Sequence, residues 1–249
     1  MVSITGRRHG SHPVERAWED DSMHIFGLPV DLVILDVDGV ILDILKVLRK
    51  NLEETASALG LPLGPVAMSL EQIAQGKMRI KGNAHDSTRM MWPDLDDKGV
   101  DGFVDLFHQI ERTRTYDPIE GSLETISFLR EQGVAVALAT NNPTDVLEWR
   151  LATAGIDPAW FAAVVTRDNV YFKPHPQTFD PIFEAVRISR NRALYVGDLQ
   201  IDWDMARGAG VRFFAVLSGG VPREAFVDEG VPDTHIFSRL SDILTHVEL

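Results

Sequence analysis

The stretch Leu32-Val33-Ile34-Leu35-Asp36-Val37-Asp38-Gly39-Val40 carries the strongest signal for fold and function in this chain. An apolar run, typical of a buried strand, ends in two carboxylates one residue apart and a glycine. Strand alternation predicts that Asp36 and Asp38 point to the same side. Two such charges repel each other unless a cation lies between them, and Mg²⁺ is a hard ion that prefers carboxylate oxygen. The alternative is a strand end followed by an Asp-Gly turn.

Composition narrows the class of protein. The chain has 249 residues, enough for one large domain or two modest ones, and its formal net charge of −13 argues against a nucleic-acid or anionic-membrane partner. The absence of cysteine excludes disulfides, zinc–thiolate sites and cysteine nucleophiles. No apolar run approaches the roughly 18 residues of a transmembrane helix, and the start of the chain lacks the apolar core of a secretory signal. A cytoplasmic location is therefore expected.

The order of predicted elements indicates two parts and an extension. Residues 1–28 are polar and are expected to form a loosely ordered N-terminal extension. Residues 29–42 and 117–249 alternate strands with helices, which predicts an α/β fold, a Rossmann-like parallel sheet sandwiched by helices. Residues 43–116 read mainly as helix and are expected to form an inserted α-helical cap domain. The expected strands cover residues 32–36, 134–139, 162–165, 193–196, 213–217 and 235–237. The expected helices cover residues 45–59, 69–75, 100–114, 123–131, 145–154, 177–186, 202–209 and 240–247.

Polar residues follow the predicted strands at the edge where an open parallel sheet binds its ligands. Thr140-Asn141 follows the second core strand, and Gly197-Asp198 follows the strand at 193–196, with Asp202 four residues on. Lys173 lies in the loop before the helix at 177–186. Each cluster has a simpler interpretation, as a helix cap, a turn or plain surface. Because all these clusters follow strands in this order, we expect their side chains to form one site.

Together these clusters resemble the four motifs of the haloacid dehalogenase superfamily of phosphohydrolases. Residues 36–40 resemble the first motif, Thr140 the second, Lys173 the third, and Gly197-Asp198 with Asp202 the fourth. By the same resemblance, the insertion after the first motif is similar to the helical cap of phosphoglycolate phosphatase and β-phosphoglucomutase.

The residue types fit phosphate ester cleavage. A carboxylate such as Asp36 can attack phosphorus and form an aspartyl-phosphate, while Asp38 protonates the leaving oxygen and then takes a proton from water. Thr140 and Lys173 would stabilise the phosphoryl oxygens. The expected ligands of the Mg²⁺ ion are Asp36, the carbonyl of Asp38, Asp198 and, as a further or outer ligand, Asp202.

Further residues are expected to contact the substrate. Gly39 and Asn141 lie within the motifs, and Arg79 and Lys81 belong to a cationic, glycine-bounded stretch that could reach over the pocket. The alternative for Arg79 and Lys81 is a solvated cap face.

These observations favour a Mg²⁺-dependent phosphatase of a small phosphorylated metabolite, of the phosphoglycolate or sugar phosphate type, acting as a monomer or homodimer. Val40 keeps a second hypothesis open, because the Asp-Gly-Val form of the first motif also occurs in phosphomutases of the β-phosphoglucomutase type. The acidic composition and atypical motif neighbours, such as Leu199 where Ser or Thr is common in the family, also allow a third hypothesis, a catalytically silent binding protein with the same fold.

Overall fold

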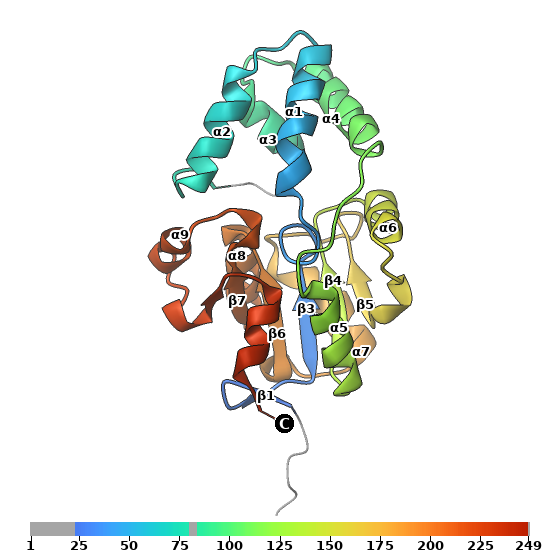
Figure 1. The fold of residues 1–249 in the computed structure, drawn as a ribbon, viewed down its shortest axis with the longest axis vertical. Coiled ribbons are helices and arrows are strands. Elements are labelled where there is room, and N and C mark those ends of the chain that lie inside the picture. Colours follow the sequence, from blue (N-terminus) through green and yellow to red (C-terminus); the bar gives the residue numbers. More distant parts are fainter. Residues whose placement is uncertain (1–22, 80–83, 249) are drawn as a thin grey trace, which may run out of the picture.

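A six-stranded parallel sheet forms the centre of the molecule. The computed structural model describes residues 23–79 and 84–248. The strands follow the order β5-β4-β3-β6-β7-β8, which places the first strand of the sheet, β3, in its interior (Figure 1). Their bounds are β3 Leu32–Leu35, β4 Ala135–Ala139, β5 Ala163–Val165, β6 Ala193–Gly197, β7 Arg212–Val216 and β8 Ile236–Phe237. The predicted α/β fold is confirmed.

Both faces of this sheet are covered because its strands are apolar on both sides. Val33 and Leu35 pack into one hydrophobic cluster, and Leu32 and Ile34 pack into another on the opposite face. The first cluster includes residues of α5 (Ser122–Glu131), α6 (Thr144–Thr153) and the 3-10 segment Leu240–His246. The second includes residues of α7 (Asp180–Val186), α8 (Gln200–Ala209) and α9 (Arg223–Asp228).

Four helices lie beyond the carboxyl edge of the sheet (Figure 1). They are α1 (Leu45–Ala58), α2 (Gly64–Ala74), α3 (Ala84–Met91) and α4 (Asp97–Glu111). Their side chains build a hydrophobic cluster of their own, around Trp92 and Phe103. We call residues 45–111, in their described part, the helical insert.

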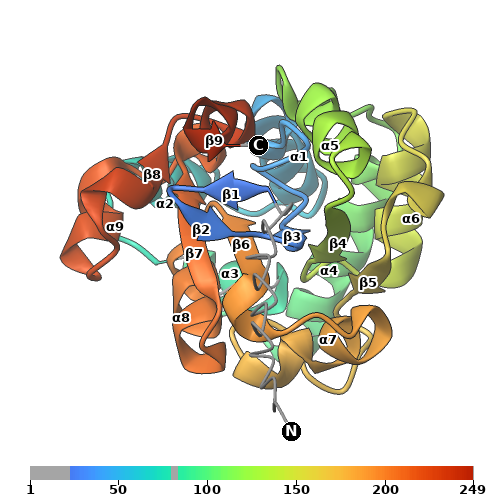
Figure 2. The ribbon, with the colours of Figure 1, turned by 90° about the horizontal axis from the view of Figure 1, so that it is seen from below.

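Several details differ from the prediction. Helices α3 and α9 were not expected, and residues 240–246 form a 3-10 helix rather than an α-helix. Of the predicted N-terminal extension, residues 1–22 lie outside the described residues. Residues 23–28 are ordered, because β1 (His24–Ile25) pairs with both β2 (Leu28–Pro29) and the C-terminal strand β9 (Val247–Glu248). This small sheet lies below the core, at the end opposite the helical insert (Figures 1 and 2).

Candidate active site

Lys173 is at the centre of a buried group of charges at the carboxyl edge of the sheet. Its Nζ atom lies 2.8 Å from Asp36 Oδ2 and 2.9 Å from Asp202 Oδ1, and the side chain is only 2% exposed. Burial disfavours the charged form, but the charges of Asp202 and Asp36 outweigh it and raise the pKa of Lys173. The lysine is therefore a fixed cation beside Asp36.

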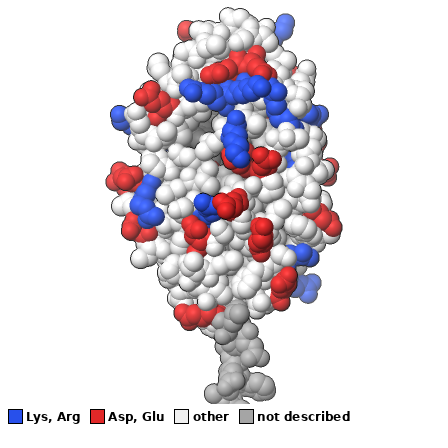
Figure 3. Space-filling model, viewed as in Figure 1, with Lys and Arg blue, Asp and Glu red and all other residues white. Residues whose placement is uncertain are grey.

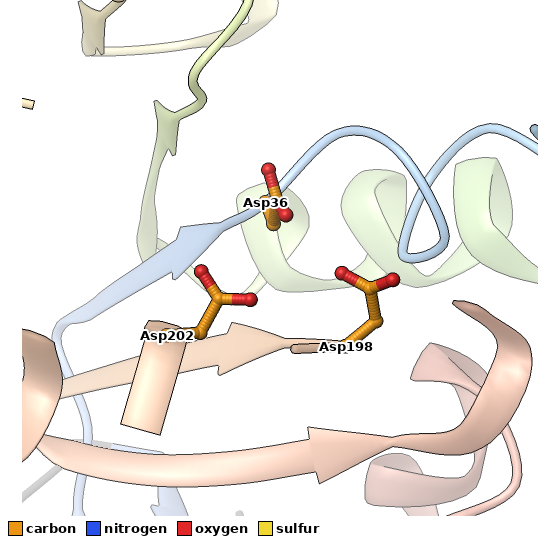
Figure 4. Close-up of side chains that lie close together, drawn as sticks. All are labelled: Asp36, Asp198 and Asp202. Atoms are coloured by element: carbon orange, nitrogen blue, oxygen red, sulfur yellow. The ribbon is translucent and has the colours of Figure 1, made fainter. Parts of the chain in front are cut away.

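Three carboxylates meet at this point. One oxygen each of Asp36, Asp198 and Asp202 lies within 4.8 Å of the others (Figure 4). Asp36 directly follows β3, Asp198 directly follows β6, and Asp202 lies in the first turn of α8. Because β3 and β6 are parallel neighbours, their ends bring residues 162 positions apart in the chain together.

Burial shapes the electrostatics of this group. It raises the pKa of Asp36 to about 7, with Lys173 opposing the shift and the charges of Asp202 and Asp38 adding to it. Burial also raises the pKa of Asp198 well above its usual value, and the charges of Asp36 and Asp202 act in the same direction. A cation between Asp36 and Asp198 would relieve this cost.

Asp198 has the features of a residue that binds a divalent cation. Its Oδ1 is buried and accepts no hydrogen bond from any donor in the described part of the chain. A Cβ atom on Gly39 or Gly219 would lie 2.3 Å or 1.7 Å from Asp198 Oδ2, so both glycines are needed to make room for this carboxylate. The residues present therefore fit a hard cation held by oxygen.

Asp202 has a different environment from Asp198. Its Oδ1 accepts hydrogen bonds from Lys173 Nζ and, at 2.6 Å, from the Tyr195 hydroxyl, and its Oδ2 accepts from the Leu199 amide at 3.0 Å. These contacts occupy both oxygens. Asp202 thus holds Lys173 in place, and its role as a further or outer metal ligand stays a prediction.

Asp38 faces the same cavity, but its side chain turns away from the three carboxylates. Its Oδ2 accepts a hydrogen bond from Asn142 Nδ2 at 2.7 Å and forms an ion pair with Arg150. The carboxylate is 23% exposed, more than that of Asp36 at 6%. This position suits proton exchange better than metal binding by the side chain.

Arg150 was not predicted, and it connects two parts of the molecule. This residue of α6 is 3% exposed and pairs with both Asp38 and Glu111, the last residue of α4. Burial works to raise the pKa of Glu111, but His108, Arg150 and Tyr116 outweigh it and lower the pKa. Arg150 therefore joins the carboxylate of Asp38 to the end of the helical insert.

The other predicted motif residues lie at the same edge. Thr140 Oγ1 accepts from the Asn142 amide at 3.1 Å, and Thr140 lines the cavity. Asn141 Oδ1 accepts from the Lys173 amide and Asn141 Nδ2 donates to the Lys173 carbonyl, each at 3.0 Å, so Asn141 positions the Lys173 loop. Gly39 adopts a φ of +74° and its amide donates to the Leu42 carbonyl at 2.9 Å.

Of the two predicted cap residues, only Arg79 lies in the described part of the chain, and it does not join this group. Arg79 pairs with Asp204 at 2.7 Å and with Glu229 at 3.3 Å, and it does not line the cavity. Lys81 lies outside the described residues.

A cavity of about 330 Å³ separates the sheet edge from the helical insert. Asp36, Asp38, Lys173 and Asp198 line it on the side of the sheet. A molecule bound there would contact the buried charges of the sheet edge and the helices of the insert at the same time.

Comparison with known proteins agrees with this description. A model of the haloacid dehalogenase-like hydrolases matches residues 30–210. A phosphoglycolate phosphatase from Vibrio parahaemolyticus is 26% identical over 215 residues, which cover 82% of this chain and 92% of the relative. Pyrophosphatase PpaX from Halalkalibacterium halodurans is 27% identical over 154 residues, covering 60% and 70%. The crystal structure of a predicted phosphoglycolate phosphatase from Haemophilus somnus has a TM-score of 0.73 at 22% identity, covering 87% and 97%, which shows the common fold.

A parallel sheet with buried carboxylates and a buried lysine at its carboxyl edge defines an enzyme of the α/β class. The chain belongs to the haloacid dehalogenase-like hydrolase family, as its motifs predicted. The phosphatases among its relatives agree with the predicted hydrolysis of phosphoric monoesters. None of the described helices is long and apolar enough to span a membrane.

Proposed function

We propose that this protein is a Mg²⁺-dependent phosphatase that hydrolyses a small phosphorylated metabolite through an aspartyl-phosphate on Asp36. The observation that carries the proposal is the contact of Asp36 with Lys173, next to the buried carboxylate of Asp198, whose Oδ1 accepts no hydrogen bond from the described residues. A negatively charged phosphoryl group needs such compensation before a carboxylate can approach it.

In the first half of the reaction, a carboxylate oxygen of Asp36 attacks phosphorus, and the bond from phosphorus to the ester oxygen breaks. Asp38 donates its proton to the departing oxygen. Lys173 and the Thr140 hydroxyl stabilise the phosphoryl oxygens during this step.

In the second half, Asp38 takes a proton from a water molecule, whose oxygen attacks the phosphorus of the aspartyl-phosphate. The bond between phosphorus and Asp36 breaks, so the carboxylate of Asp36 is regenerated and phosphate leaves. The same residue therefore acts first as an acid and then as a base.

Asp36, Asp198 and the carbonyl of Asp38 would hold the Mg²⁺ ion, with Asp202 outside them. When bound, the ion supplies positive charge that lets the anionic substrate approach the carboxylates. The helical insert, within residues 43–116, acts as a cap over the site, since it covers the cavity that contains these groups. The substrate enters between the two parts.

The direct test is release of phosphate from p-nitrophenyl phosphate by the purified protein. Activity is expected with Mg²⁺ and is expected to disappear with EDTA and return when Mg²⁺ is added. Asp36→Asn should lower kcat at least about 10⁴-fold because it removes the nucleophile. Asp228→Asn, on the exposed end of α9, is the matched control and should leave kcat unchanged. Full activity of Asp36→Asn would refute the mechanism.

A further inference from the structure

The wall of the cavity that the helical insert provides carries no formal charge. Among its described residues that line the cavity there is no Lys, Arg, Asp or Glu. Most are apolar, and they come from all four helices. Representative members are Leu48, Leu52, Ile73, Met90, Val104 and Phe107.

Three arginines in the helical insert, or just after its end at residue 111, have acidic partners away from the cavity. Arg89 pairs with Asp97 at 2.7 Å within the insert, Arg114 pairs with Glu54, and Arg112 pairs with Asp145 on α6. On the face shown in Figure 3, the blue and red side chains lie next to one another on the outer surface. These arginines are therefore occupied by acidic partners outside the cavity.

The titratable groups on this wall also have partners. His85 Nε2 lies 3.4 Å from Asp101 Oδ1, and His108 Nδ1 lies 3.1 Å from Glu111 Oε2. The Thr88 hydroxyl donates to the carbonyl of Ala84 at 2.8 Å within α3. The hydroxyls of Ser69 and Ser87 also line this wall, so its described polar side chains are present but outnumbered by apolar ones.

We infer that the organic part of the substrate is apolar, so that the enzyme acts on alkyl or aryl phosphomonoesters. This inference rests on the proposed function. The phosphate would lie at the sheet edge, beside Lys173, and the organic group would lie against the insert. Each methylene moved from water into such a wall is favourable by about 0.8 kcal/mol. A carboxylate placed there would lose its hydration without gaining a lysine or arginine partner among the described lining residues of the insert.

Arg167 offers the main opposing possibility. It lines the cavity on the side of the sheet, its Cζ lies 4.2 Å from the ring centre of Phe172, and its buried Nη1 donates to no acceptor among the described residues. A short acid such as phosphoglycolate could place its carboxylate there. Phosphoglycolate is therefore the proper competitor in the test.

The first measurement compares kcat/KM for ethyl, butyl and hexyl phosphate with kcat/KM for phosphoglycolate and glucose 6-phosphate. The value is expected to rise about fourfold for each methylene added to the alkyl chain. Hexyl phosphate should be preferred over both polar substrates. A flat or falling series, or a preference for phosphoglycolate or glucose 6-phosphate, would overturn the inference.

A pair of matched variants tests whether the insert provides the selectivity. Met90 lines the cavity, whereas Met68, on α2, is 61% exposed and does not line it. Met90→Lys should lower kcat/KM for hexyl phosphate at least about tenfold and raise it for phosphoglycolate about tenfold, since a charged partner then faces the carboxylate. Met68→Lys should change neither value. A gain for phosphoglycolate cannot arise from misfolding, and equal behaviour of the two variants would contradict the inference.

Binding of inert alkylphosphonates separates the inference from the proposed function. Ethyl-, butyl- and hexylphosphonate are not hydrolysed, so calorimetry measures their Kd without turnover. A protein that fails to hydrolyse p-nitrophenyl phosphate but binds these ligands about fourfold more tightly per methylene would refute the proposed function and support the apolar site. A protein that hydrolyses p-nitrophenyl phosphate, but whose Kd for the alkylphosphonates does not depend on chain length, would support the proposed function and refute the apolar site.

Discussion

The sheet edge and the helical insert face each other across one cavity, but they present opposite chemistry to it. The sheet edge contributes the charged lining residues, among them Asp36, Asp38, Lys173 and Asp198. The described residues of the insert contribute apolar side chains, two histidines and a few hydroxyls. Under the proposed function, this difference would divide the roles, with bond cleavage at the sheet edge and choice of the organic group at the insert.

Substitution of Asp38 gives the strongest test of whether bond cleavage depends on the sheet edge. We expect Asp38→Asn to lower kcat about 10²- to 10⁴-fold because the leaving oxygen loses its proton donor. The loss should be smaller for p-nitrophenyl phosphate than for an alkyl phosphate, because nitrophenolate leaves without protonation. Steady-state kinetics with both substrates measure this, and an equal loss for both would argue against the role of Asp38 as an acid.

Arg150 tests the connection between the two regions. We expect Arg150→Met to lower the free energy of unfolding by about 3–5 kcal/mol, since the carboxylates of Asp38 and Glu111 lose their buried cation. Urea denaturation measures the change. Arg49→Met removes an exposed pair with Glu53 on α1 and should cost less than about 1 kcal/mol. Similar losses for the two variants would contradict the structural role of Arg150.

Glycine-to-alanine substitutions in the two regions are expected to have different effects. Gly219→Ala would bring a Cβ atom to 1.7 Å from Asp198 Oδ2, so we expect the carboxylate to move and the Mg²⁺ concentration at half-maximal activity to rise about tenfold. Gly102, in α4 of the insert, has open space around it, and Gly102→Ala should stabilise the protein by about 0.5–1 kcal/mol. An unchanged Mg²⁺ requirement in Gly219→Ala would show that Asp198 is not a ligand.

The smallest effect is expected at Arg79. Its pairs with Asp204 and Glu229 are on the surface, and its side chain is 45% exposed. We expect Arg79→Ala to change kcat/KM by less than about threefold and the free energy of unfolding by less than about 1 kcal/mol. A larger loss of kcat/KM with unchanged stability would restore its predicted role in substrate binding.

The sequence predicted the sheet edge well because its signals are local. A strand of four apolar residues ending in Asp36 can be read from neighbouring residues, and the same holds for Gly197-Asp198 after β6. The rule that parallel strands place their carboxyl ends together then supplied the proximity of Asp36, Asp198 and Lys173.

Long-range contacts between ordinary residues could not be predicted in this way. Arg150 and Glu111 are 39 residues apart, and each is of a type that is usually exposed, so nothing in the sequence pairs them. The pairing of β1 with β9 depends on two-residue strands from opposite ends of the chain, which are too short for a periodic pattern. Arg79 was proposed for the site because it is basic, but Asp204 and Glu229 offer it partners on the surface.

The ion pairs between insert and core also make the enzyme sensitive to its ionic environment. Arg79 pairs with Asp204 and joins the insert to α8. Arg112, directly after the insert, pairs with Asp145 of α6. These side chains are exposed or partly exposed, whereas the pair of Arg150 with Glu111 is buried. Dissolved salt weakens exposed pairs far more than buried ones, because its Debye length is about 10 Å at 0.1 M. Rising ionic strength should therefore loosen the outer contacts of the insert while its connection at Arg150 holds.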